Sequence, residues 1–363
     1  MKIISTITNL YKNRIYIARK IREYINLKLF LMQKNKIKIK PEIAACKSVG
    51  IMLMEKGIGD VIVCSGMIKL LRDNGYRVTV FTESRLRELF QYKLISVDEN
   101  IEIKFVHNKY ISTQPLPHVD IVINLFNPGS HTYRVIRFIR QISYYYLVSP
   151  NERSEVYDIV TDYDGNTHIS NLFLNILHTA FPNIKFDHYE YAVNAPAGDN
   201  KVQDFLTKVT DNNRKKLIVI NSKGGGDYKV LSKQTIQRIC SDLLASKKDY
   251  AIVVMNFADD SIYNDQIVKN PFSSLSDSLY MVINSYCLIT PDTSFVHFAN
   301  AFKLNSICIY NHMGSSNVSW APNYENALQI STDECSGDNK HGDDIKKIKY
   351  SIVYDALKKK MLI

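Results

Sequence analysis

The stretch at residues 49–60 reads Val-Gly-Ile-Met-Leu-Met-Glu-Lys-Gly-Ile-Gly-Asp, an apolar run that ends in a glycine turn and a carboxylate. A short apolar run of this kind is typical of a strand buried on both faces of a parallel sheet. Residues 61–74 continue with a helical pattern. The order of strand, tight turn and helix predicts an α/β fold with a doubly wound parallel sheet.

Strands and helices alternate on both sides of a polar segment at 195–200, which we interpret as a linker because it is rich in turn-forming residues. Further elements are predicted before the linker at 77–82, 85–92, 101–106 and 119–125, and after it at 217–221, 233–246, 250–255, 287–290, 294–302, 306–310 and 343–362. The predicted organisation is a basic amphipathic extension (1–40), a first Rossmann-like domain (41–195), a second Rossmann-like domain (200–340) and a terminal helix (341–363). Two such domains place a ligand cleft at the carboxyl ends of their strands.

The net charge of +10 comes from one end of the chain. Residues 1–40 contain 11 of the 46 Lys and Arg but only one acid, Glu23, so the remaining residues are balanced. Apolar residues interleave with these cations, which suits a helix on an anionic membrane surface. A helical extension packed on the protein and a disordered basic arm are the alternatives. Nucleic acid is a weaker candidate because the remainder is neutral.

The apolar runs are too short to cross a bilayer, and residues 1–40 lack a signal-peptide core, so we expect a cytoplasmic protein. The cysteines form no C-x-x-C pair, which predicts reduced thiols and no metal site. They are Cys46, Cys64, Cys240, Cys287, Cys308 and Cys335. The D-x-D sequence at Asp162 and Asp164 lacks a preceding strand and is interpreted as a surface loop.

The first candidate motif is Lys56-Gly-Ile-Gly-Asp60, directly after the first strand. The glycines permit a tight turn that brings backbone close to a ligand. Asp60 could take a proton from an attacking hydroxyl, or it could cap the following helix. The full G-x-G-x-x-G pattern is absent, so a dinucleotide fold of the NAD type is weakly supported.

The second and third motifs follow predicted strands of the second domain. Residues 221–229 read Asn-Ser-Lys-Gly-Gly-Gly-Asp-Tyr-Lys, a loop whose amides could hold a phosphate or which could be a surface turn. Residues 290–299 read Thr-Pro-Asp-Thr-Ser-Phe-Val-His-Phe-Ala and could bind phosphate at a helix N-terminus or simply initiate that helix. His297 could contact a ligand or be a half-buried imidazole.

In this order and spacing the three motifs, followed by Trp320-Ala-Pro322, resemble glycosyltransferase family 9, the ADP-heptose:lipopolysaccharide heptosyltransferase family. The resemblance covers roughly residues 48–330, and it implies that 41–195 is the acceptor-side domain and 200–340 the nucleotide-sugar-binding domain. It implies a GT-B fold and inverting, metal-independent transfer of heptose from ADP-heptose to a lipid-linked lipopolysaccharide core. No cofactor is implied, and the enzyme would work at the cytoplasmic face of the inner membrane.

The resemblance also implies roles for individual residues. Asp60 would be the catalytic base, and Lys229 would neutralise charge on the leaving diphosphate. The donor would be bound by Gly224, Gly225, Asp292, Thr293, Ser294 and His297. Arginines that could engage an anionic acceptor, or form a solvated basic face, are Arg85, Arg87, Arg134, Arg137 and Arg140.

Two other classes of function remain open at this stage. One is an NAD-dependent oxidoreductase or epimerase, which would use the same sheet architecture. The other is a non-enzymatic basic peripheral-membrane scaffold in which residues 1–40 carry the function. Both are kept because a resemblance in fold is by itself a weak argument for function.

Overall fold

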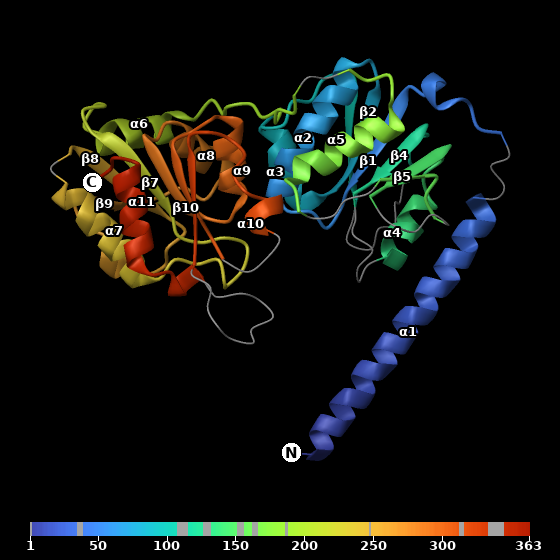
Figure 1. Cartoon of the computed structure of the whole chain (residues 1–363), viewed down its shortest axis with the longest axis horizontal. Coiled ribbons are helices and arrows are strands. Elements are labelled where there is room, and N and C mark those ends of the chain that lie inside the picture. Colours follow the sequence, from blue (N-terminus) through green and yellow to red (C-terminus); the bar gives the residue numbers. More distant parts are fainter. Residues whose placement is uncertain are drawn as a thin grey trace.

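The computed structural model describes residues 2–363 except 35–38, 107–114, 126–131, 151–155, 162–165, 186–187, 247, 312–315 and 333–344. Of residues 2–13, 15, 19, 132–134 and 316 only the backbone is described. The described chain forms two parallel six-stranded sheets side by side, with a long N-terminal helix that runs away from the body (Figure 1).

The first sheet has the strand order β3-β2-β1-β4-β5-β6, and all its strands pair in parallel. Its strands are β1 (Ser48–Leu53), β2 (Arg77–Glu83), β3 (Ile101–Val106), β4 (Ile121–Asn124), β5 (Tyr146–Ser149) and β6 (Ile159–Val160). The order reverses between β1 and β4. A ligand site in such a sheet is expected at the carboxyl ends of the strands beside this point.

The second sheet has the order β12-β11-β10-β7-β8-β9 and repeats the same topology, again with parallel pairing throughout. Its strands are β7 (Lys216–Asn221), β8 (Tyr250–Met255), β9 (Ile267–Lys269), β10 (Cys287–Pro291), β11 (Ser306–Tyr310) and β12 (Ala327–Ser331). Here the order reverses between β7 and β10. The second and third sequence motifs start at these two strand ends, which is the position expected for a ligand site.

Most of the helices that accompany the sheets connect parallel strands, as the crossover rule requires. The helices are α2 (Ile58–Asp73), α3 (Arg87–Gln91), α4 (Thr132–Ile139), α5 (Ile169–Ala180), α6 (Asn200–Val209), α7 (Lys233–Ala245), α8 (Leu275–Ile283), α9 (Ser294–Ala301), α10 (Ser316–Ser319) and α11 (Tyr350–Lys359). Of these, α5 and α6 join the two sheets, and α11 follows the last strand. Single 3₁₀ turns lie at Ile43–Ala45, Ser84–Leu86, Asp260–Ile262 and Ile345–Lys347. The fold class predicted from the sequence, two doubly wound α/β units with a basic helical extension, is confirmed.

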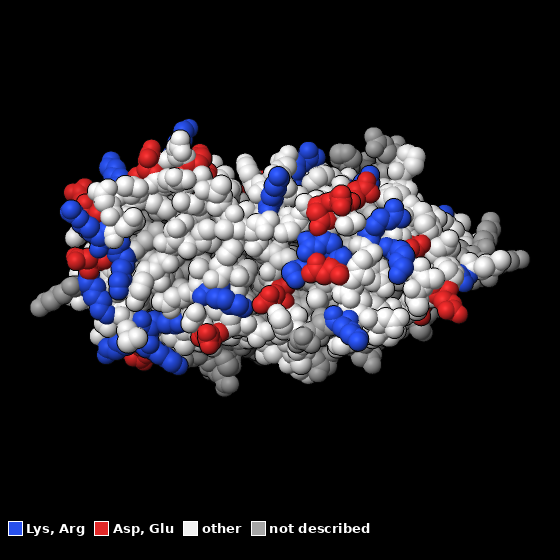
Figure 2. Space-filling model, turned by 90° about the horizontal axis from the view of Figure 1, so that it is seen from above, with Lys and Arg blue, Asp and Glu red and all other residues white. Residues whose placement is uncertain are grey.

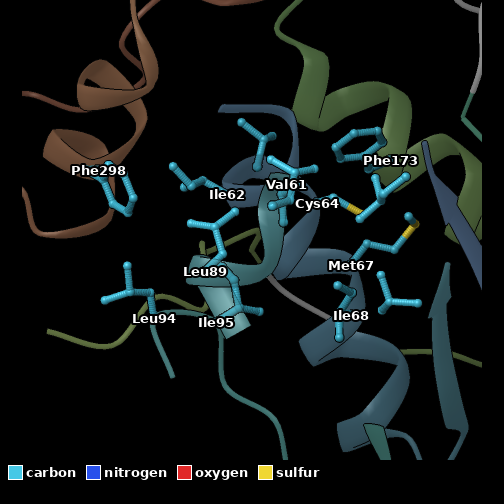
Figure 3. Close-up of a cluster of buried hydrophobic side chains, with 14 of the residues drawn as sticks. Val61, Ile62, Cys64, Met67, Ile68, Leu89, Leu94, Ile95, Phe173 and Phe298 are labelled. Carbon is cyan, nitrogen blue, oxygen red and sulfur yellow. The ribbon is translucent and has the colours of Figure 1, made fainter. Parts of the chain in front are cut away.

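One hydrophobic core is continuous between the two halves. Alternate residues of β1, such as Ile51, and of β7, such as Val219, belong to the same buried cluster. Figure 3 shows where the halves meet: Phe298 of α9 faces Ile62 of α2. Because α2 and α9 pack directly on each other, the segments that precede these two helices are brought together.

Several expected details differ. The chain from 343 onward is not one helix, because a 3₁₀ turn at Ile345–Lys347 precedes α11, which begins at Tyr350; Asp343 and Asp344 lie outside the described residues. Of the predicted linker at 195–200, residues 195–199 carry neither helix nor strand, while Asn200 begins α6. Asp199 caps α6 by accepting from Val202 N–H at 2.9 Å. The division into domains at these boundaries stays a prediction.

The expectation of thiols is confirmed for five cysteines, which are free and buried, while Cys335 lies outside the described residues. The Asp162–Asp164 sequence also lies outside them. Over the described residues, no cluster of three or more potential metal ligands is found. Nor does the described chain contain a helix both long and apolar enough to span a bilayer.

Among its described side chains, those of the N-terminal helix α1 (Lys2–Lys34) that pack on the body lie near its C-terminal end. Phe30 is buried in the core that α4 also lines, and Lys34 forms an ion pair with Asp158 at 3.2 Å. Farther out, apolar side chains are exposed along one helical face, which comprises Ile17, Ile21, Tyr24, Ile25, Leu29 and Met32. Thus a packed extension describes the C-terminal end of α1, whereas Ile17, Ile21 and Ile25 are exposed.

Candidate active site

Asp60 lies in the first turn of α2, immediately after the turn that follows β1. Its Oδ2 accepts from the Gly57 N–H at 2.7 Å, and the Lys56 ammonium lies 3.9 Å from Oδ1. The capping role considered from the sequence is therefore confirmed. The carboxyl group is still about one quarter exposed, at 25%, so capping does not remove it from solvent or from a reacting hydroxyl.

Arg85, in the 3₁₀ turn that follows β2, forms hydrogen bonds that hold the turn after β1. Its guanidinium donates to the Lys56 carbonyl at 2.7 Å and to the Glu83 carboxylate at 2.8 Å. Glu83 in turn accepts from the Glu55 N–H at 3.1 Å. These bonds fix the backbone that leads into Asp60, and they put a second cation beside the first motif.

Lys229 and Asp292 join the second motif to the third. The Lys229 ammonium donates to Asp292 Oδ2 at 2.5 Å, and the two side chains are 22% and 9% exposed. Burial raises the pKa of the Asp292 carboxyl, and the charge and hydrogen bond of Lys229 act against that rise. Removing either side chain would therefore leave the other as a largely buried charge without an opposite charge beside it.

The glycine loop fits closely against this pair at one position. A Cβ on Gly224 would lie 2.9 Å from Lys229 Cβ, 2.9 Å from Thr293 Cγ2 and 3.0 Å from the Asp292 carbonyl oxygen. The loop is closed by a hydrogen bond from the Gly224 N–H to the Lys229 carbonyl at 2.7 Å. In contrast, a Cβ on Gly225 would meet no atom within 4 Å. Gly224 is thus needed for packing, whereas Gly225 leaves its backbone open to a ligand.

A network of polar side chains lies at the ends of β7, β8 and β10, and it includes Asn221, Thr290 and Asn256, to which the sequence assigned no role. Asn221, which is fully buried, donates to Thr290 Oγ1 at 3.0 Å and to Thr293 Oγ1 at 3.5 Å. Asn256 donates to Asn221 Oδ1 at 2.8 Å. Thr293 caps α9 by accepting from the Phe295 N–H at 3.1 Å. The N-terminus of α9 is therefore held against the second motif by hydrogen bonds from two neighbouring strand ends.

Ser294 is the first residue of α9 and is partly exposed. Asp292, Thr293 and Ser294 therefore occupy the helix entrance, as expected. Because backbone N–H groups at a helix N-terminus carry partial positive charge, this entrance suits an anionic group, and Lys229 adds a full charge beside it.

His297 lies between the two halves of the molecule and is 4% exposed. A Cβ on Gly59 would lie 2.7 Å from its Cδ2 atom. Burial lowers the pKa of His297 to about 3, with smaller contributions from His168 and Lys229. The contact between Gly59 and His297 joins the first motif to the third, so all three predicted motifs meet at one junction.

The predicted acceptor arginines do not form one cluster. Arg85 adjoins the Asp60 turn, whereas Arg87 lies over the Phe105 ring and Arg140 contacts Gln33 of α1. Arg137 is exposed on α4, and the side chain of Arg134 lies outside the described part of the chain. Of this group, Arg85 is the one that the structure puts beside the first motif.

Acidic and basic side chains are interspersed over the face of the body drawn in Figure 2. This agrees with the balanced charge of the sequence beyond residue 40. Neither sign of charge forms an uninterrupted surface over this face.

No protein-family model matches the chain. Among curated proteins, it is 23% identical to "Putative lipopolysaccharide heptosyltransferase 4" of Escherichia coli K12, and the match covers 88% of this chain and 90% of that protein. Among solved structures, a glycosyl transferase family 9 protein of Veillonella parvula superposes with a TM-score of 0.66 at 14% identity, covering 89% of this chain and 99% of the other. The chain has the fold of glycosyltransferase family 9. The resemblance drawn from the three motifs is confirmed.

Two further solved structures of similar fold contain a bound nucleotide or nucleotide-sugar. The Escherichia coli heptosyltransferase WaaC with ADP has a TM-score of 0.63 at 12% identity, and the match covers 86% of this chain and 99% of that one. The Escherichia coli dodecameric heptosyltransferase TibC, described as iron-containing and in complex with ADP-D-β-D-heptose, has a TM-score of 0.51 at 10% identity over 90% of this chain and 79% of that one. Such likenesses establish the GT-B arrangement of this chain.

Proposed function

We propose that the chain is a glycosyltransferase that moves heptose from ADP-heptose to a lipid-linked lipopolysaccharide core acceptor, with inversion and without a metal. The observation that carries this proposal is the meeting of three groups at one junction: the Asp60 turn, the Lys229–Asp292 pair and the α9 N-terminus. A carboxylate on one side and a cationic, amide-rich pocket on the other are what direct displacement of a diphosphate requires.

In the proposed mechanism, Asp60 accepts the proton of the acceptor hydroxyl as that oxygen attacks the anomeric carbon of the donor. The bond from this carbon to the diphosphate oxygen breaks, and the leaving nucleoside diphosphate gains negative charge. Attack from the face opposite the leaving group inverts the anomeric configuration.

Lys229 and the first turn of α9 stabilise the charge that develops on the diphosphate. Lys229 is held by Asp292, and Thr293 is held by Asn221, so both groups are oriented before the donor binds. Preorganised donors of this kind cost no reorganisation during the reaction, which is why electrostatic stabilisation can supply several kcal/mol, about 3 kcal/mol for one donor. Lys229 also provides positive charge beside the diphosphate, a role that a metal ion can have in other enzymes.

We place the proposed activity at the cytoplasmic face of the inner membrane, because the lipid-linked acceptor resides in a bilayer. The support comes from α1, which combines exposed apolar residues with Arg14, Lys20, Arg22 and Lys28. Lys28 also lies 4.9 Å from the ring centre of Tyr24, an arrangement in which a cation can reach lipid phosphates while the ring enters the interface.

A panel of nucleotide-sugars offered to the purified protein with a truncated core acceptor tests the proposal. We expect ADP release with ADP-heptose that depends on the acceptor, persists in EDTA and yields the anomer opposite to that of the donor. Turnover lost in EDTA would reject metal independence, and retention of configuration would reject the Asp60 mechanism. Preferential binding of NAD without ADP release would favour an oxidoreductase instead.

A further inference from the structure

We propose that His297 is a positioning residue, which holds the Lys56–Asp60 turn against α9 and so sets where the Asp60 carboxylate stands. This role rests on the proposed function of Asp60, and it goes beyond the donor-binding role that the family resemblance implies for His297.

The imidazole makes a close contact with the turn itself. A Cβ on Gly59 would lie 2.7 Å from His297 Cδ2 and 3.2 Å from Nε2. Real Cβ atoms do not approach other heavy atoms this closely, so residue 59 must be glycine while His297 keeps its position. Because Asp60 is the next residue along the chain, a movement of the ring would shift the backbone that carries the carboxylate.

The ring is itself held from both halves of the molecule. Its centre lies 6.4 Å from that of Tyr191 and 5.6 Å from that of Trp320, at steep interplanar angles of 62° and 71°. Edge-to-face contacts of this kind are favourable between aromatic rings. His297 therefore sits in a fixed aromatic setting and is not a free side chain at the edge of a pocket.

Tyr191 belongs to a segment that is fastened to α2. The Tyr189 hydroxyl donates to the Val63 carbonyl at 2.6 Å, and the Ala192 N–H donates to Ser65 Oγ at 2.8 Å. Through Tyr191, His297 is therefore linked to α2, the helix that begins with the Asp60 turn. His297 contacts α2 directly through Gly59, and it contacts the segment fastened to α2 through Tyr191. Its own helix, α9, begins after the Thr293 cap, where the donor diphosphate is proposed to bind.

The imidazole is neutral in this setting, because burial lowers its pKa to about 3. A neutral ring adds no positive charge to a diphosphate, so the shape and contacts of His297 are what it contributes. Lys229, whose ammonium group also disfavours protonation of His297, is the cation of the donor site.

The test compares four full-length variants with the wild type: Gly59→Ala, His297→Ala, the double variant, and His178→Ala as an exposed-histidine control. We expect hydrogen exchange of the peptide spanning residues 55–63 to become several-fold faster in His297→Ala, with little change in the control. In transfer assays, His297→Ala should lower kcat about 10- to 100-fold, with the KM for ADP-heptose changed less than about twofold.

The double variant tests the contact independently of activity. Since an alanine at 59 would enter the space of the imidazole, removing the ring should suppress part of the loss of thermal stability caused by Gly59→Ala. Additive losses, unchanged exchange at 55–63, or a raised donor KM with unchanged kcat would each overturn the proposal. If the wild type transfers no sugar, the proposed function fails, while the exchange and coupling measurements still decide whether His297 holds the turn.

Discussion

The Lys229 ammonium group and the Asp292 carboxylate are in direct contact, at 2.5 Å, at the point where the glycine loop meets the entrance of α9. Burial and ion pairing act in opposite directions on Asp292, and burial is the larger effect, so the pKa of this carboxyl is raised. Without the Lys229 ammonium, keeping the Asp292 carboxylate ionised would therefore lower the folding stability.

Replacing Lys229 with Met should therefore destabilise the protein in a pH-dependent way. A carboxyl whose folded pKa lies above its unfolded value reduces stability as pH rises from the unfolded value through the folded one. Without Lys229 the pKa of Asp292 rises further, so the loss should be small near pH 4 and reach about 3 kcal/mol near neutral pH. Urea unfolding near pH 4 and near neutral pH measures this loss of stability. Adding Asp292→Asn to this variant should remove the pH dependence of the loss caused by Lys229→Met, and an equal loss at both pH values would contradict this account.

Two neighbouring glycines should respond differently to alanine. Gly224→Ala places a methyl group 2.9 Å from Lys229 Cβ and Thr293 Cγ2, so the loop or α9 must shift, and we expect a loss of about 1–3 kcal/mol. Gly225→Ala meets open space and should leave the melting temperature almost unchanged. Differential scanning fluorimetry of the two variants is sufficient, and equal melting temperatures would show that the loop packs differently.

Asp60→Asn should abolish transfer while preserving the fold. The amide oxygen of Asn can still accept from the Gly57 N–H, so the capping contact survives, but the amide cannot take a proton at neutral pH. Loss of a general base typically costs about 10²- to 10⁴-fold in rate. Asp73→Asn, at the other end of α2, is the matched control and should retain activity. Substantial turnover by Asp60→Asn would remove the base assignment.

Much of the fold follows from the sequence because buried parallel strands are read as apolar runs. The strands at 101–106, 250–255 and 306–310 have the predicted bounds. Short edge strands such as β6 and β9 were not predicted, since two or three residues carry little periodicity and their pairing is decided by the neighbouring strand.

Part of the candidate site could likewise be predicted from the sequence, and part could not. The positions of Asp60, Lys229 and Thr293 at strand ends could be predicted from local pattern. The hydrogen bonds among Asn221, Thr290 and Asn256 could not, because they depend on which strands lie side by side, and the neighbourhood of β7 and β10 arises only where the strand order reverses. The signal that could have found them is a polar residue at the carboxyl end of each strand.

The exposed apolar face of α1 should bind anionic bilayers. We expect the full-length protein to float with vesicles that contain phosphatidylglycerol, to bind phosphatidylcholine vesicles weakly, and to detach as salt screens the charges. Ile17→Ser/Ile21→Ser/Ile25→Ser should reduce flotation strongly, whereas Val97→Ser, an exposed apolar residue of the body, should not. If the helix instead pairs with a second copy, flotation will be absent and the mass in solution will double.

Wild-type stability should depend on His297 at mildly acidic pH. Its pKa is lowered by burial to about 3, below the ordinary histidine value of 6.5, so the unfolded chain takes up a proton that the folded one excludes. Stability is then fully present above about pH 6.5 and falls as the pH drops toward the folded value, by at most about 1.4 kcal/mol per pH unit. His297→Asn should show a flatter pH profile between about pH 7 and pH 4, because it lacks this group while His168 and the carboxyl groups are unchanged. Urea unfolding of both proteins across that range measures the difference, and parallel profiles would mean that the imidazole is accessible to protons in the folded state.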